Sequence, residues 1–303
     1  MKFYSFFLLI SLGLCWGTSF SIAKFTVLSG INPISYAFWQ NVGPAILVFF
    51  ILFLKEKKLF HFSRSPVSLT SGSKNYFIFC FAAGFLGIFL PNLLQYFSAP
   101  HLPSGILGLI VNTSPLFTYV LSILFFVEEF SYKRLLSVLA AIFGMFFIFY
   151  PKSFSVLNMH WLFVALSIPF LLACTTVYTV KFRPKNKSSL HLASGMLIAS
   201  CLFTVPLTFF TNHFVSISNI HFLPNLFIIL EIILSSLGYV LFFELLRVAG
   251  PIYYSLVGCI VALSSLFWGY FLFHEKPTML ASIGILFVLI AVFTISYKKP
   301  TSS

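Results

Sequence analysis

The chain of 303 residues contains six acidic side chains, and all six are glutamates. Without aspartate, the aspartate-rich metal sites of membrane prenyltransferases and phosphotransferases cannot be assembled. The seven histidines show neither H-x-x-x-H nor H-E-x-x-H spacing, and neither a G-x-S-x-G motif nor a Walker loop is present. We therefore predict no catalytic residue, no metal site and no cofactor, and we exclude ATP-driven transport by this chain alone.

Glu231 is the acid whose position is most suggestive of function, because it lies inside a long apolar run with no basic residue within one helical turn. On a helix it shares a face with Ser235, Gly238, Tyr239 and Phe242. Burial of a carboxyl without a partner disfavours its charged form, so Glu231 is a candidate for proton coupling or for binding a substrate cation. The alternative is that the helix begins one turn later and Glu231 only reaches the interface.

Other polar side chains also lie within apolar runs, where they usually face a bundle interior or a wet cavity. Asn92, Gln95 and Tyr96 share one helix face, whereas many other amides and small residues serve only to join helices. The residues that we predict to line a binding site are Trp16, Gln40, Asn92, Gln95, Tyr96, Asn112, Tyr178, Tyr239 and Ser255. Aromatic members of this set could stack on a flat or cationic ligand.

The elements that position these residues are membrane-spanning helices. Hydrophobic residues make up 59% of the chain and charged residues 8%, against about 25% charged residues in soluble domains. Runs of roughly 20 apolar residues, each long enough to cross about 30 Å of hydrocarbon, follow one another. We predict an all-α polytopic membrane protein with ten spans, at 3–23, 34–54, 76–98, 103–126, 135–151, 160–180, 191–211, 225–246, 252–273 and 279–297. The five cysteines fall inside these runs, without a C-x-x-C pair, and predict neither disulfides nor zinc.

Basic residues determine the predicted orientation. If the N-terminus is cytoplasmic, fifteen of the eighteen Lys and Arg residues lie on the cytoplasmic side, and only Lys24, Lys152 and Lys276 lie outside. This asymmetry predicts that both termini are cytoplasmic. It also explains the net charge of +12 without a nucleic-acid partner, because the charges sit in short connections and at the chain ends rather than along one face.

The chain contains an internal repeat. The segment from Tyr96 to Glu128 aligns without a gap with the segment from Phe243 to Glu275, 147 positions later. In both, a helix end and a short break precede a long apolar run that finishes in an acid. We therefore predict two five-helix halves, 1–151 and 152–303. Since five is odd, the second half must insert upside down relative to the first.

The repeat places Glu128 and Glu275 at opposite membrane surfaces. Each acid stands at the end of an apolar run, where it can bond to backbone or to a neighbouring loop. We predict that they are structural or latch a gate at the two faces. The two copies differ inside the run, because Asn112 and Pro115 of the first align with Cys259 and Ala262 of the second.

These residues resemble a known family. The segment LPSGILGLIVNTSPLFTYVLSILFFVE, followed by a helix with Gly144, is similar to the half-repeat of EamA-type carriers of the drug/metabolite transporter superfamily, and CWGTSF at 15–20 resembles the Trp-Gly motif of the family's first span. The second half keeps the acid at Glu275 but has Ala262 in place of the mid-span proline. Many members carry an arginine in the second span where this chain has Gln40, which weakens the case for an anionic substrate.

The resemblance implies a secondary transporter in the bacterial inner membrane that moves a small organic molecule by alternating access. The polar but almost uncharged set of predicted lining residues favours a neutral or zwitterionic metabolite, such as an amino acid or a nucleoside-like compound. The expected partners are this substrate and the lipid bilayer, with a homodimer left open and no nucleic acid. The alternative is a membrane sensor or assembly factor that retains the carrier fold without transporting.

Overall fold

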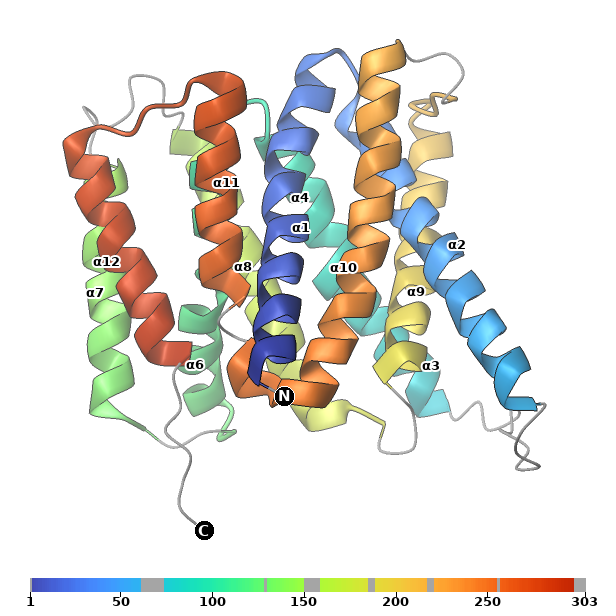
Figure 1. Ribbon diagram of the computed structural model, residues 1–303, viewed down its shortest axis with the longest axis horizontal. Helices are drawn as coiled ribbons and strands as arrows, with labels where there is room; N and C mark the ends of the chain where they lie inside the picture. Colours follow the sequence, from blue (N-terminus) through green and yellow to red (C-terminus); the bar gives the residue numbers. More distant parts are fainter. Residues whose placement is uncertain are drawn as a thin grey trace.

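A computed structural model describes residues 2–60, 74–127, 130–149, 159–184, 189–216, 221–254 and 257–296, and every regular element in these ranges is a helix (Figure 1). The helices are α1 (Lys2–Leu28), α2 (Pro33–Phe60), α3 (Lys74–Gly84), the π-helical η1 (Phe85–Phe89), α4 (Leu90–Ser98), α5 (Ser104–Val111), α6 (Ser114–Leu124), α7 (Tyr132–Phe149), α8 (Met159–Phe182), α9 (Ser189–Phe210), α10 (Phe222–Tyr254), α11 (Val257–Phe273) and α12 (Met279–Ser296). They stand side by side as one bundle.

Seven helical segments of the described chain are long and apolar enough to cross a membrane, and three shorter apolar helices accompany them. The shorter ones are 135–144, 257–273 and 279–291. Each of the ten matches one predicted span. One boundary was wrong, because α10 continues to Tyr254, past the break that the repeat places just before Pro251. A proline removes one helical hydrogen bond, but helices in a membrane tolerate it where neighbouring groups satisfy the freed carbonyl.

Two of the spans are not regular α-helices. In the third, α3 and α4 are joined by the π-helical turn η1; such turns insert one extra residue and often accompany functional sites. In the fourth, the chain breaks at Asn112 and Thr113, where α5 ends and α6 begins, with Pro115 in the first turn of α6. The aligned helix α11 continues across Cys259 and Ala262. The two copies of the repeat therefore differ where their sequences differ.

Helix contacts follow the predicted symmetry of the two halves. In the first half, α1 packs on α10 and α11 of the second; in the second half, α8 packs on α4 and on α5 and α6 of the first. The contact of α2 with α10 in one half corresponds to the contact of α9 with α3 and η1 in the other. Three further contacts join a helix to its own counterpart in the other half: α2 to α9, α5 to α11 and α7 to α12. In Figure 1, α1 runs from the lower to the upper end of the bundle and its counterpart α8 runs the opposite way.

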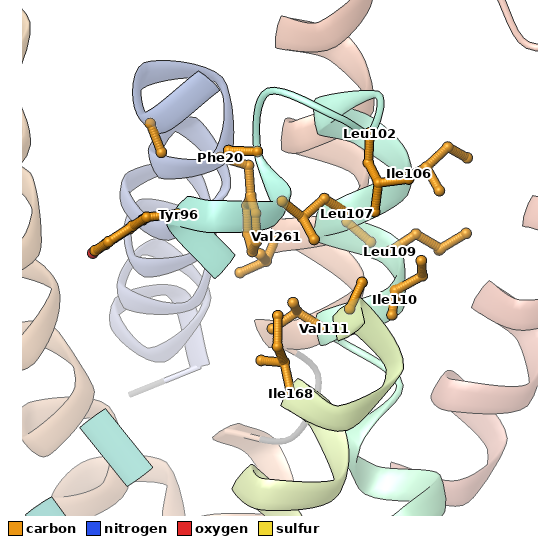
Figure 2. Packing of buried hydrophobic residues seen from close by; sticks show 14 of the residues in the cluster. Phe20, Tyr96, Leu102, Ile106, Leu107, Leu109, Ile110, Val111, Ile168 and Val261 are labelled. Atoms are coloured by element: carbon orange, nitrogen blue, oxygen red, sulfur yellow. The ribbon is translucent and has the colours of Figure 1, made fainter. Parts of the chain in front are cut away.

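The core lies where helices of both halves meet. Figure 2 shows Phe20 and Val261 against Leu107, with Ile110 and Ile168 close by, so α1, α5, α8 and α11 share this apolar cluster. Glycines allow the helices to approach: a Cβ on Gly17 of α1 would lie 2.8 Å from the backbone oxygen of Val261. Small residues serve this purpose in membrane helices, because lipid offers no hydrophobic driving force for association.

Candidate functional site

Glu231 is buried in the bundle, with 2% of its surface exposed. Its Oε1 accepts a hydrogen bond from the Ser235 hydroxyl at 3.0 Å, one turn along α10. The Ser19 hydroxyl of α1 lies beside the same carboxyl, whereas Oε2 has no hydrogen-bond partner within the described residues. The acid is therefore buried between helices, and α10 begins nine residues before it, at Phe222.

Three tyrosines lie in the same part of the bundle as this carboxyl. Tyr36 of α2, Tyr96 of α4 and Tyr239 of α10 all lie within electrostatic range of Glu231. The rings of Tyr36 and Tyr96 meet edge to face, with centroids 4.7 Å apart. Figure 2 shows Tyr96 at the edge of the apolar cluster, with its ring directed away from Leu107. In this part of the bundle α10 packs on α2, and α2 in turn packs on α4.

Gln40 approaches the same turn of α10 from α2. Its Nε2 donates to the backbone oxygen of Ile228 at 3.2 Å, three residues before Glu231. The side chain is 3% exposed, and its Oε1 has no hydrogen-bond partner in the described part of the chain. Close approach of α2 and α10 is possible here because residue 43 is glycine: a Cβ on Gly43 would lie 2.7 Å from Ile232 Cγ2.

Trp16 brings α1 to the same region. Its ring centroid lies 6.1 Å from that of Tyr239 in a T-shaped arrangement and 5.9 Å from that of Phe242. Its indole nitrogen occupies the space where a Cβ of Gly238 would otherwise stand. Cys15, the residue before it, also lies within electrostatic range of Glu231. Trp16, Tyr239 and Glu231 are therefore neighbours, and they come from both halves of the chain.

Asn92 takes part in a polar network between helices. Its Nδ2 donates to Asn41 Oδ1 at 3.1 Å, and Asn41 Nδ2 donates to Thr204 Oγ1 at 2.8 Å. The Thr204 hydroxyl in turn donates to the Ser200 backbone oxygen. This chain of hydrogen bonds joins α4, α2 and α9, so the Asn92 amide also holds helices together.

The remaining predicted residues are spread more widely. Asn112 ends α5, donates to the Gly108 backbone oxygen at 2.7 Å and lies against Gly258 of α11. Tyr178 stacks on Phe79 at 5.6 Å, in a separate cluster, and the structure does not bring it to Glu231. Gln95 is half-buried on α4. Ser255 and Glu128 lie outside the described residues.

Glu275, in the turn between α11 and α12, forms a second polar cluster that joins three segments of the chain. This turn lies at the upper end of the bundle in Figure 1. Lys24 of α1 binds its Oε1 at 2.6 Å, with both side chains largely buried. The Ser104 backbone N–H donates to Oε1 at 3.0 Å, and the Ser104 hydroxyl to Oε2 at 3.1 Å. Lys24 also donates to the Leu102 backbone oxygen at 3.0 Å. We call Lys24, Ser104 and Glu275 the latch.

Among the residues of these clusters, sequence reasoning missed Tyr36 and Lys24. Tyr36 precedes Gln40 by one helical turn, and this spacing could have pointed to it, but the chain contains 13 tyrosines. Lys24 is one of only three basic residues assigned to the outer side, yet its partner lies 251 positions away. Such long-range pairs depend on tertiary packing, which no local pattern specifies.

The model of the EamA-like transporter family matches residues 3–150 and again residues 159–297. The chain belongs to the EamA-like transporter family. This confirms the family resemblance and the two-repeat architecture, and it makes the chain a multi-pass membrane protein of a transporter family.

Two individual relatives agree with this assignment. The chain is 25% identical to Protein PecM from Dickeya dadantii (strain 3937) over 219 residues, which cover 71% of this chain and 72% of the relative. A solved crystal structure, whose title names no function, aligns over 98% of both chains with a TM-score of 0.60 and 12% identity. At that identity the structural match establishes the fold alone.

Proposed function

We propose that this protein is a secondary transporter that carries a small organic metabolite, neutral or zwitterionic, across the inner membrane of a bacterium. The observation that carries the proposal is the position of Glu231, which is buried where helices of both halves meet, in a chain of the EamA-like transporter family. A carrier with inverted halves binds its substrate near the bilayer midplane, at the interface of the repeats. We assign binding to the residues around Glu231: Trp16, Gln40, Tyr96 and Tyr239.

We propose ten membrane spans with both termini in the cytoplasm, and a division of the chain into halves at residues 151 and 152. The arrangement in Figure 1 supports an even number of spans, because α1 begins and α12 ends at the same end of the bundle. The helix ends next to most Lys and Arg residues, including the end of α8 with Lys181, lie at that end too. The excess of basic residues there is typical of a cytoplasmic surface.

The latch suggests how the outer side is closed. With this orientation, Lys24, Ser104 and Glu275 lie at the outer end of the bundle, where they tie α1 and α5 of the first half to the α11–α12 turn of the second. We propose that the latch is the closed outer gate and that it must open when the transporter faces outward. Glu128 aligns with Glu275, and we propose the corresponding role for it at the cytoplasmic side.

Glu231 remains the candidate for energy coupling. A proton on this carboxyl would neutralise a buried charge that has no basic partner among the described residues. The titratable groups within electrostatic range of it are Cys15, Tyr36, Tyr96 and Tyr239. If the proton bound to Glu231 from one side and left to the other as the transporter changed between its outward-facing and inward-facing states, transport would be coupled to the proton gradient.

Flux measurements in proteoliposomes test the proposal. Purified protein is reconstituted into vesicles loaded with a bacterial metabolite extract, and the solutes that leave are identified by mass spectrometry under imposed solute and proton gradients. We expect one chemical class of solute to leave faster than from protein-free vesicles. No solute flux under any gradient would contradict the carrier proposal and favour the sensor or assembly-factor alternative.

A further inference from the structure

Within the part of the chain that the structure describes, three buried oxygens around Glu231 lack hydrogen-bond partners. They are Glu231 Oε2, Gln40 Oε1 and Tyr36 Oη, and the exposed fractions of these side chains are 2%, 3% and 0%. A buried polar atom without a partner costs roughly 1–3 kcal/mol, so native proteins leave few of them. All three atoms can accept a hydrogen bond.

These oxygens belong to one region of the bundle. Tyr36 and Gln40 are one turn apart on the same face of α2, and Gln40 is bonded to the turn of α10 that leads to Glu231. Tyr36 lies within electrostatic range of Glu231. A ligand group next to the carboxyl would therefore meet a cluster of acceptors from two helices.

Aromatic rings surround the same region. Tyr36 and Tyr96 meet edge to face, and Trp16 contacts Tyr239. The faces of such rings attract cations, most strongly where water is excluded. Lys24, the basic residue of α1 nearest in sequence to Trp16, does not supply a positive charge to this region, because it is bound to Glu275 in the latch. The region therefore offers a carboxylate, further acceptors and aromatic faces, which suit a ligand with positive charge and N–H donors.

We propose that the transported substrate is a zwitterionic metabolite with a primary amine, and that its ammonium group donates hydrogen bonds to Glu231, Gln40 and Tyr36. A primary ammonium has three N–H donors, which equals the number of unpartnered oxygens. This inference rests on the proposed function and specifies its substrate class. It distinguishes a primary from a quaternary ammonium, since a quaternary nitrogen has the charge but no donor.

A matched series of probes tests this proposal in the full-length protein. The probes are 2-phenylethylamine, its N-methyl, N,N-dimethyl and N,N,N-trimethyl derivatives, and the neutral analogue 2-phenylethanol. Binding is measured in detergent solution as a saturable, concentration-dependent rise in thermal stability. We expect affinity to fall at each methylation, by about 100-fold from the primary to the quaternary compound, because hydrogen bonds to charged groups are lost in turn.

Variants connect the binding to the three oxygens. Tyr36→Phe removes one oxygen and nothing else, and it should weaken 2-phenylethylamine about tenfold. Glu231→Gln should abolish selectivity for the amine over 2-phenylethanol. The matched control is Ser236→Ala, because that hydroxyl donates to its own helix at Ile232; binding should be unchanged.

Equal binding of the primary and quaternary compounds would overturn the proposal, as would failure of all the amines to bind. Unchanged amine affinity in Tyr36→Phe would also contradict it, and this variant remains informative if Glu231→Gln does not fold. The outcome is separable from that of the proposed function. If only solutes without an amine were transported, the protein would still be a carrier, but the proposed substrate class would be wrong. If amines bound but no solute were transported, the binding site would be correct and the transport function would be wrong.

Discussion

At the scale of single residues, Glu231 is the group on which the proposed binding and proton coupling depend. It is a buried carboxyl with one oxygen bonded to Ser235 and the other without a partner in the described structure. In membrane proteins, ionisable groups in such positions are expensive to maintain and usually have a function in proton or substrate movement. Its neighbours Tyr36, Tyr96 and Tyr239 carry hydroxyls that can pass or share a proton but do not bring a compensating positive charge.

The first prediction concerns Glu231 and coupling. In Glu231→Gln, flux of the substrate found in the vesicle assay should no longer respond to an imposed pH gradient, because the amide has no proton to exchange. The wild type should respond to the gradient, and Ser236→Ala on the same helix should behave as the wild type does. Survival of unchanged pH-dependent transport in Glu231→Gln would show that the proton is carried elsewhere.

The second prediction concerns the latch. Lys24→Met removes the ion pair with Glu275 but leaves the hydrogen bonds from Ser104, so the outer end should open more often without unfolding. Ile106 lies in a small hollow beside Glu275, together with Pro103 and Leu266. A cysteine in place of Ile106 should react with a membrane-impermeant thiol reagent several-fold faster when Lys24→Met is also present.

Lys24→Arg is the matched control, because it keeps the charge and should keep the slow reaction. The reaction is followed by mass spectrometry of the peptide that contains residue 106, which separates it from the five native cysteines. Equal reaction rates with Met and Arg at position 24 would mean that the ion pair does not control access.

At the scale of helices, close packing through glycine joins the two halves. Gly17 of α1 faces Ser264 and the backbone of Val261 on α11, and Gly144 of α7 would place a Cβ 2.7 Å from the Gly284 backbone oxygen on α12. A backbone atom cannot move aside as a long side chain can. These contacts therefore set the distance between α1 and α11 and between α7 and α12.

The third prediction follows from this packing. Gly17→Val should destabilise the protein by about 1–3 kcal/mol, because its side chain collides with α11. The measurement is the thermal denaturation of purified protein in detergent. Leu14→Val on the lipid-facing side of the same helix, where the leucine is 49% exposed, should have little effect. A stability of Gly17→Val equal to that of the Leu14→Val control would contradict the close packing.

The broken fourth span shows how sequence and structure relate at the scale of helices. Pro115 identified the irregularity, and the structure breaks the helix between Val111 and Ser114. Pro251 suggested a second break that is absent, since α10 continues to Tyr254. Local sequence marks where a helix can break, but neighbouring helices decide whether it does.

At the scale of the whole molecule, the apolar segments and the internal repeat predicted most of the fold. The apolar segments and the two-repeat architecture were predictable, because bilayer thickness and internal alignment constrain them strongly. The residues of the two polar clusters were less predictable. Lys24 and Glu275 are 251 positions apart in the sequence, and Tyr36 is one of 13 tyrosines. Tyr178 was predicted near the binding site and instead packs on Phe79, because an aromatic ring by itself does not specify which cluster it joins.

The fourth prediction concerns the orientation of the two halves. Phe126 and Lys276 are exposed and follow equivalent helices of the two halves. Cysteines placed there should be labelled by an impermeant reagent from opposite sides of the membrane, with Lys276→Cys accessible from outside. Labelling of both from one side would refute the inverted arrangement.

The central claim is that the two halves open alternately to the two sides of the membrane. The most direct test is to measure distances between spin labels at both ends of the bundle, in lipid nanodiscs. One pair, at Ser29 and Met279, reports on the latch end, and the other, at Tyr4 and Phe182, reports on the opposite end. We predict that Lys24→Met lengthens the first distance and shortens the second. A change at the latch end with no opposite change at the other end would contradict alternating access.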